Sequence, residues 1–286
     1  MDKFGTGQLR NVVLLSHSGA GKTSVAEAIL LATNTINRLG RIEDGNTVSD
    51  YEPEEQRRQT SLQSTVLTNI WKQAKINLLD TPGYAEFLGE TISALSVADA
   101  AILVISAPAG IEVGAEQMWR RLRAKQIPTV IFINKLDREN ADFDAVLDQI
   151  RNRFGNQCVA LNLPVGAENN FKSVHNLMSS EASGELQTGV EKAKEQITEA
   201  VAETDDALTE KYLEEGELSP EQLNEGLRNA IFSGQVVPVL AGAAATSIGI
   251  EELLDVIVSY LPSPDKARDV SAQEGGKAVQ IVATPD

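Results

Sequence analysis

Residues 16–23, with the sequence SHSGAGKT, constrain the fold of this chain more than any other stretch. They follow the apolar run 12–15 and precede residues 24–31, which are typical of a helix. Strand, glycine-containing loop and helix in this order form a phosphate-binding loop, because glycine lets successive backbone N–H groups face one anion and the helix N-terminus adds positive potential. We expect Lys22 to reach the β- and γ-phosphates and the Thr23 hydroxyl to ligate Mg²⁺.

Composition excludes several classes of function. The chain has 286 residues, of which 42% are hydrophobic, and none of its apolar stretches approaches the roughly 18 residues of a membrane helix. The first residues lack signal-peptide character, and the single cysteine, Cys158, excludes an internal disulfide and suits the cytosol. The net charge of −16 argues against a broad nucleic-acid-binding face. We therefore expect a cytoplasmic monomer with no membrane or DNA partner.

A polar stretch from Thr33 to Ser61 lacks clear periodicity. A segment of this length inside a compact domain is either disordered or a functional loop. Because it follows the phosphate-binding loop, we interpret it as a switch that becomes ordered around a γ-phosphate and its Mg²⁺. Ser61 or Thr60 is expected to supply the hydroxyl that contacts the metal.

A second phosphate-side motif follows the short apolar strand 76–79. Asp80 stands at the carboxyl end of that strand, where a carboxylate can hold Mg²⁺ through a water molecule. Gly83 lacks a side chain that would clash, so its N–H can turn onto a γ-phosphate. Asp-x-x-Gly is a common turn, and its position at a strand end is what makes it informative.

The apolar strand 129–133 ends in Asn134-Lys135-Leu136-Asp137. A carboxylate at Asp137 can accept hydrogen bonds from both the ring N1–H and the exocyclic amine of guanine. Adenine lacks this pair of donors, so a wrong base leaves buried polar groups unpaired. Asn134 is expected to brace the loop, and the aliphatic part of Lys135 is expected to lie across the base.

Further elements complete an α/β pattern. Helices are expected at 113–125 and 143–154, and another begins after the capping residue Ser219 and stops near Gly234. The apolar strand 236–241 leads into a last loop, whose backbone N–H groups could meet the guanine O6. That loop contains Gly242, Ala243 and Ala244.

The sequence thus predicts a three-layer α/β/α fold of the P-loop NTPase class, with a mostly parallel sheet and a mainly helical inserted subdomain. The near-continuous apolar run 100–105 is typical of a buried parallel strand. We assign residues 1–157 and 236–262 to the nucleotide-binding domain and 158–235 to the insertion. Residues 263–275 are interpreted as a linker, and the tail from Lys277 as the first strand of a following domain, so that 263–286 lie outside the core.

Four motifs in this order, each after a strand, resemble a GTPase of the translation-factor class. Longer stretches are similar to elongation factor G, namely residues 80–87, 163–168, 210–213, 237–242 and 260–264. The resemblance covers nearly the whole chain as a GTP-binding G domain with its inserted G′ subdomain. Ser18-Gly19, Ser61 and Tyr84 look more like the elongation factor G-like (type 2) paralogue. The resemblance implies that the chain binds GTP/GDP and Mg²⁺. It also implies that the ribosome is a partner, through ribosomal RNA at the factor-binding site and through the stalk protein.

The resemblance also implies roles for individual residues. Tyr84 stands where the family usually has a histidine that orients the attacking water, and Ser61 stands where the family has a Mg²⁺-sensing threonine. Catalysis is assigned to Lys22, Gly83 and Tyr84, and metal binding to Thr23, Ser61 and Asp80. The expected nucleotide contacts are Ser18, Gly19, Ala20, Gly21, Lys22, Thr23, Ser24, Asp80, Gly83, Asn134, Lys135, Asp137, Gly242, Ala243 and Ala244.

Three alternatives remain open from the sequence. The chain is a GTPase that acts on the ribosome, a GTP-sensing binding module with little hydrolysis, or an ATP-using P-loop enzyme, which residues 134–137 oppose. Residues 185–225 contain 13 acidic residues against three lysines. This acidic segment is either a solvated face or, as the resemblance implies for the insertion, a surface for the stalk protein.

Overall fold

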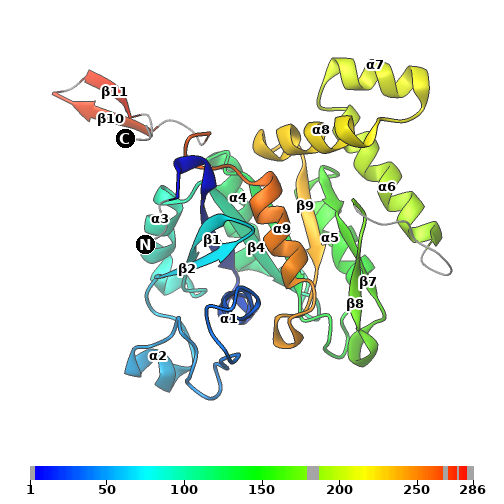
Figure 1. Cartoon of the computed structure of the whole chain (residues 1–286). Helices are drawn as coiled ribbons and strands as arrows, with labels where there is room; N and C mark the ends of the chain where they lie inside the picture. The colour runs from blue at the N-terminus through cyan, green and yellow to red at the C-terminus, as the bar shows by residue number, and fades with distance from the viewer. Residues whose placement is uncertain (1–3, 179–186, 267–269, 276, 282–286) are drawn as a thin grey trace.

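A seven-stranded sheet forms the centre of the computed structural model, which describes residues 4–178, 187–266, 270–275 and 277–281 (Figure 1). β2 and β3 pair in antiparallel fashion and all other neighbours in this sheet are parallel. The predicted α/β fold with a mostly parallel sheet is therefore confirmed. In spatial order, the strands are β2 (Thr65–Trp71), β3 (Ala74–Asp80), β1 (Leu9–Ser16), β4 (Ala100–Ser106), β5 (Thr129–Asn134), β9 (Val237–Ala241) and β6 (Cys158–Ala160).

Helices cover both faces of this sheet, so the central strands are buried on both sides. All residues of β4 and β5 are buried, which explains their continuous apolar sequences. α1 (Lys22–Ala32) and α9 (Ile250–Tyr260) pack together on one face. The other face is covered by α3 (Leu88–Val97), α4 (Val113–Ala124) and α5 (Phe143–Phe154) (Figure 1). The expected helices 113–125 and 143–154 are thus present.

The parallel strands bring the sequence motifs to one edge of the sheet. β1 ends at Ser16, β3 at Asp80 and β5 at Asn134, and the register pairs Leu14 with Asp80 and Ser106 with Asn134. The loops that follow these strands therefore lie near one another, which is the usual position of a ligand site in an open α/β sheet.

The segment between β6 and β9 leaves the sheet and is mainly helical. It contains the hairpin β7 (Asn162–Val165) and β8 (Ser173–Asn176), and then α6 (Gln187–Ala202), α7 (Asp206–Glu215) and α8 (Pro220–Phe232) (Figure 1). α8 begins after Ser219, whose hydroxyl accepts a hydrogen bond from Gln222 N, as the capping signal predicts.

One predicted boundary of this insertion is wrong. The sequence analysis places the start of the insertion at residue 158, but β6 pairs in parallel with β9 at the edge of the main sheet. Its residues Cys158, Val159 and Ala160 are all buried, so this short apolar strand belongs to the core. The chain leaves the sheet only after Ala160.

The expected linker 263–275 is also partly wrong. β10 (Val270–Glu274) lies inside it and pairs in antiparallel fashion with β11 (Lys277–Ile281). The intervening sequence is Gly-Gly, which is a hairpin signal that the linker interpretation overlooked.

Among the described residues, no helix has the length and apolar character needed to cross a membrane.

Candidate functional site

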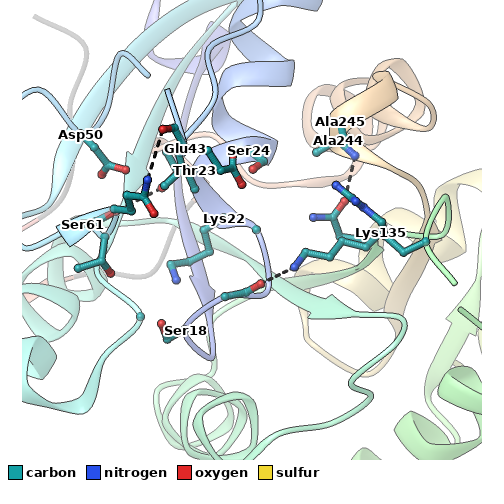
Figure 2. Close-up of a pocket in the computed structure, with 18 of the residues that line it drawn as sticks. Ser18, Lys22, Thr23, Ser24, Glu43, Asp50, Ser61, Lys135, Ala244 and Ala245 are labelled. Carbon is teal, nitrogen blue, oxygen red and sulfur yellow. Dashed lines mark hydrogen bonds between the residues drawn. The ribbon is translucent and has the colours of Figure 1, made fainter. Parts of the chain in front are cut away.

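A cleft of about 350 Å³ opens at the carboxyl edge of the main sheet (Figure 2). Its walls come from the loop before α1, from the stretch between α1 and β2, and from the loops after β3, β5 and β9. The described residues that line it are Ser18, Gly19, Gly21, Lys22, Thr23, Ser24, Ile42, Glu43, Asp50, Gln59, Thr60, Ser61, Gly83, Tyr84, Asn134, Lys135, Asp137, Arg138, Ala244 and Ala245.

Two glycines shape the loop between β1 and α1. Gly19 has φ +80° and Gly21 has φ +96°, a backbone region that L side chains rarely adopt. A Cβ on Gly21 would also lie 2.5 Å from the Asn134 side-chain nitrogen. The loop can therefore turn sharply, and the amino end of α1 faces the cleft, where backbone N–H groups favour an anion.

Lys22 carries a positive charge into the cleft from the first turn of α1. Its side chain is buried, and Nζ donates a hydrogen bond to Ser16 Oγ at 2.9 Å. Burial lowers the pKa of Lys22, while the charges of Asp80 and Asp50 act in the opposite direction. Ser16, which replaces the first glycine of the usual phosphate-binding pattern, thus serves as the acceptor for this lysine.

A cluster of oxygen atoms lies next to Lys22. Thr23 Oγ1 donates to Asp80 Oδ2 at 2.9 Å, and Ser49 Oγ donates to the same oxygen at 2.7 Å. The hydroxyls of Thr23 and Ser61 are 3.2 Å apart. Burial raises the pKa of Asp80, and Lys22 and these hydroxyl donors oppose that shift. Thr23, Ser61 and Asp80, predicted from distant parts of the sequence, are therefore neighbours.

This cluster fits Mg²⁺, which prefers oxygen ligands. Among the described residues, Asp80 Oδ1 and both carboxylate oxygens of Asp50 are buried without a hydrogen bond of ordinary geometry. Buried carboxylate oxygens are normally paired, so these atoms are available for a cation or its water ligands. The donor set consists of hydroxyl and carboxylate oxygens, with no histidine or cysteine among them.

Asp50 is a site residue that the sequence did not single out. It is 4% exposed and faces the cleft (Figure 2). Burial raises the pKa of Asp50 to about 6; the nearby Ser61 hydroxyl opposes this shift, and the charge of Asp80 adds to it. The stretch from Thr33 to Ser61 contains several acidic residues, and nothing local distinguishes this one. Other lining residues missed by the sequence are Ile42, Glu43, Gln59, Arg138 and Ala245.

Gly83 packs directly against the phosphate-binding loop. A Cβ at this position would lie 2.6 Å from Lys22 Nζ and 2.8 Å from Ser18 Cα. Only glycine therefore fits between the loop after β3 and the loop before α1. Tyr84 follows at the mouth of the cleft with 47% of its surface exposed.

Asn134 connects three loops on the opposite side of the cleft. Its Nδ2 donates to Ala20 O at 3.1 Å, and its Oδ1 accepts from Ala244 N at 2.9 Å. Lys135 Nζ donates to Gly19 O at 2.6 Å (Figure 2). Asn134 thus braces the loops, as expected from the sequence, and Asp137 lines the same end of the cleft.

Four residues expected to contact the nucleotide do not line the cleft. Ala20 and Ala243 are buried, and Ala243 N donates to Ile248 O at 2.9 Å, so this N–H is already paired. A Cβ on Gly242 would overlap the Phe132 ring, so packing explains this glycine. Asp80 is buried and accepts a hydrogen bond from the Thr23 hydroxyl. Of the three residues expected in the last loop, only Ala244 borders the cleft, together with Ala245.

Comparison with known proteins defines the class. The family model described as "Elongation factor Tu GTP binding domain" matches residues 7–263, so the chain belongs to this family of GTP-binding domains. The family implies a GTPase that binds GTP or GDP with Mg²⁺.

More particular similarity is to elongation factor G. The chain is 37% identical over 273 residues to elongation factor G of Thermotoga petrophila, which covers 90% of this chain and 39% of that protein. A crystal structure of a Thermus thermophilus protein superposes with a TM-score of 0.85 at 32% identity, covering 91% of this chain and 41% of the other. The chain thus spans about two fifths of the length of these relatives. Its GTP-binding domain is therefore similar to the corresponding part of elongation factor G.

Proposed function

We propose that the cleft binds GTP with Mg²⁺ and that the chain hydrolyses GTP slowly alone and faster on a ribosome. The observation that carries this proposal is the meeting of Lys22, Thr23, Gly83 and Asp137 in one cleft from separate loops. The chain would act as the G domain, with an inserted G′-like subdomain, of an elongation factor G-like protein of the type 2 kind. On this proposal, residues up to Ala160 and residues 236–262 form the G domain.

On this proposal, different residues of the cleft would bind the phosphates and the metal ion. Backbone N–H groups of residues 18–24 would hold the phosphates, with Lys22 beside the γ-phosphate. Thr23, Ser61 and Asp80 would hold Mg²⁺, directly or through water, with Asp50 close enough to accept from a water ligand. When bound, the ion neutralises charge that develops on the phosphate oxygens.

The hydrolytic step would depend on positioning rather than on a strong base. The Gly83 N–H and the Lys22 ammonium would stabilise charge on the γ-phosphate. The Tyr84 hydroxyl can donate and accept hydrogen bonds and would orient the attacking water, although a phenol is a poorer base than an imidazole. Phosphoryl transfer relies mainly on positioning and charge stabilisation, so tyrosine at this position is compatible with turnover.

Base selection is assigned to the opposite end of the cleft. The Asp137 carboxylate would accept from the guanine N1–H and exocyclic amine, and the stem of Lys135 would lie across the base. Backbone N–H groups of Ala244 and Ala245 border this end, although that of Ala244 already donates to Asn134. We assign the contact with guanine O6 to this loop, with the Ala245 N–H as donor in place of those of Gly242 and Ala243.

The ribosome is the proposed partner and the cytoplasm the proposed place of action. Ribosomal RNA would contact the nucleotide-binding face. The acidic segment 185–225, whose described part forms α6, α7 and the start of α8, would contact the stalk protein. Asp and Glu residues there are complementary to a basic partner surface.

Single-turnover GTP hydrolysis with and without ribosomes tests the function. We expect ribosomes to raise the rate by at least about 10²-fold, because a partner can complete the positioning of the transition state. Tyr84 is the feature that favours a second candidate, a GTP-sensing module with little hydrolysis. Guanine-nucleotide binding with a hydrolysis rate that ribosomes leave unchanged would support the module and contradict the GTPase proposal.

Replacing Gly83 with alanine is expected to slow hydrolysis by about tenfold or more, because the added methyl forces Lys22 or Ser18 to move. GDP affinity is expected to change much less, since GDP has no γ-phosphate at this position. Stopped-flow binding of a fluorescent GDP and single-turnover hydrolysis measure the two effects.

Gly89→Ala in α3 is the matched control, because a Cβ there meets nothing within 4 Å. Equal hydrolysis rates for Gly83→Ala and Gly89→Ala would contradict the assignment of Gly83 to the γ-phosphate.

A further inference from the structure

A buried carboxylate on α1 has no role in the site described so far. Glu27 lies one turn after Thr23 on the same helix and is 1% exposed. Its Oε2 accepts a hydrogen bond from Gly40 N at 3.0 Å, and its Oε1 accepts from Val48 N at 2.6 Å. Both carboxylate oxygens are therefore used to hold the backbone of the stretch that follows α1.

That stretch, residues 40–61, forms one wall of the cleft. We refer to it as the 40–61 segment. Its contributions to the lining are Ile42, Glu43, Asp50, Gln59, Thr60 and Ser61. The Ser61 hydroxyl contacts the Thr23 hydroxyl. Ser49, which belongs to the same segment, donates a hydrogen bond to Asp80. The segment therefore reaches the proposed metal position directly.

The contact between α1 and the segment is close. A Cβ on Gly40 would lie 2.5 Å from Glu27 Oε2 and 2.8 Å from Asn46 O. Glycine at residue 40 therefore lets the backbone approach the carboxylate within hydrogen-bonding distance. Hydrogen bonds from backbone N–H to an ionised carboxylate are stronger than neutral ones, and buried N–H groups left unpaired are costly.

A second buried carboxylate holds the other end of the segment. Glu55 in α2 (Pro53–Arg58) is 1% exposed, and its Oε1 accepts from Leu62 N at 2.9 Å and from Gln63 N at 3.2 Å. These two residues directly follow Ser61. The segment is thus attached by carboxylates on both sides of the residues that face the cleft.

We propose that Glu27 is a positioning residue that keeps the 40–61 segment closed over the γ-phosphate and metal end of the site. The inference rests on the proposed function, because it assigns the segment to recognition of the γ-phosphate. The phosphate-binding loop and the residues 134–137 reach the cleft independently of Glu27. Loss of Glu27 therefore weakens binding of GTP relative to GDP, and it slows hydrolysis, while GDP binding is retained.

Glu27→Gln is the sharpest variant, because glutamine has nearly the same shape but only one acceptor oxygen. One of the two N–H groups then faces an amide NH₂. Glu54→Gln is the control, since Glu54 lies on α2, is partly exposed and pairs only with Arg57 and Arg58 among the described residues.

The readout is the ratio of affinities for GDP and for a slowly hydrolysed GTP analogue, both with Mg²⁺, together with the thermal midpoint of unfolding. We expect Glu27→Gln to lower the preference for the GTP analogue by about tenfold, with GDP affinity within about twofold of the wild type. Glu54→Gln is expected to match the wild type. Equal losses for both nucleotides, or an unchanged ratio, would overturn the proposal.

Hydrogen exchange of the nucleotide-free protein separates this inference from the proposed function. Glu27→Gln is expected to speed exchange of the amides of Gly40 and Val48, whether or not a guanine nucleotide binds. Unchanged exchange overturns the role of Glu27, whereas a wild type that binds no guanine nucleotide refutes the proposed function. Gly40→Ala disturbs the same contact from the side of the 40–61 segment, because its Cβ would lie 2.5 Å from Glu27 Oε2. It is expected to lower the preference for the GTP analogue in the same way, so it tests the proposal if Glu27→Gln does not fold.

Discussion

Replacing Lys22 with methionine is expected to lower single-turnover GTP hydrolysis by about 10²- to 10³-fold, the usual effect of removing one charge-stabilising donor. Lys22 is buried at the start of α1, and its ammonium group lies beside Ser16 and Gly83. No other lysine or arginine lines this end of the cleft among the described residues, since Lys135 and Arg138 belong to the base-binding loop.

The stability of Lys22→Met is expected to change little. Methionine removes an ammonium group whose burial lowers its pKa, but it also leaves Asp80 and Asp50 without a nearby positive charge. These effects oppose each other, so the thermal midpoint is expected to move by no more than about 4 °C. Lys172→Met, at an exposed position between β7 and β8, is the control. Unimpaired hydrolysis by a folded Lys22→Met protein would exclude Lys22 from the reaction.

Replacing Asp137 with asparagine is expected to weaken GTP binding by about 10²-fold or more, because guanine donors and the amide NH₂ would face each other unpaired. Xanthine carries a carbonyl where guanine carries the exocyclic amine, and this carbonyl can accept from asparagine. The variant is therefore expected to prefer xanthosine nucleotides. Competition of GDP and xanthosine diphosphate against a fluorescent nucleotide measures the change in preference.

Asp144→Asn on the exposed start of α5 is the matched control for this exchange, since Asp144 lies outside the cleft. It is expected to keep the preference for guanosine nucleotides. If Asp137→Asn kept that preference as well, the assignment of base recognition to residues 134–137 would be wrong.

Much of the fold follows from local sequence. Central strands such as β4 and β5 are continuous apolar runs because helices cover both of their faces, and this pattern indicates a parallel sheet. Loops after parallel strands must lie at one edge, so the neighbouring positions of Thr23, Asp80 and Asn134 could be expected once the strands were located.

Contacts between distant segments could not be predicted in the same way. The hydrogen bonds of Glu27 to Gly40 and Val48 depend on how the 40–61 segment folds back on α1. Asp50 is one of several acidic residues in that segment, and only its burial beside Asp80 distinguishes it. Local periodicity carries no information about either arrangement.

Short elements account for the errors in predicted boundaries. β6 has only three residues, too few for a periodic pattern, and its place in the sheet depends on pairing with β9.

The hydrogen bond of the Ala243 N–H could not be foreseen either, because its acceptor, Ile248 O, comes from a tight local turn. The sequence placed this loop after the strand that forms β9, but it did not show which residues of the loop border the cleft.

Isothermal titration calorimetry of the wild-type chain with GDP and with ADP, both in Mg²⁺, tests the central claim most directly. The claim is that loops from separate strands form one guanine-nucleotide site. We expect one GDP site per chain and at least about 10²-fold weaker binding of ADP, because adenine cannot satisfy Asp137. Equal binding of the two nucleotides, or binding of neither, would contradict it.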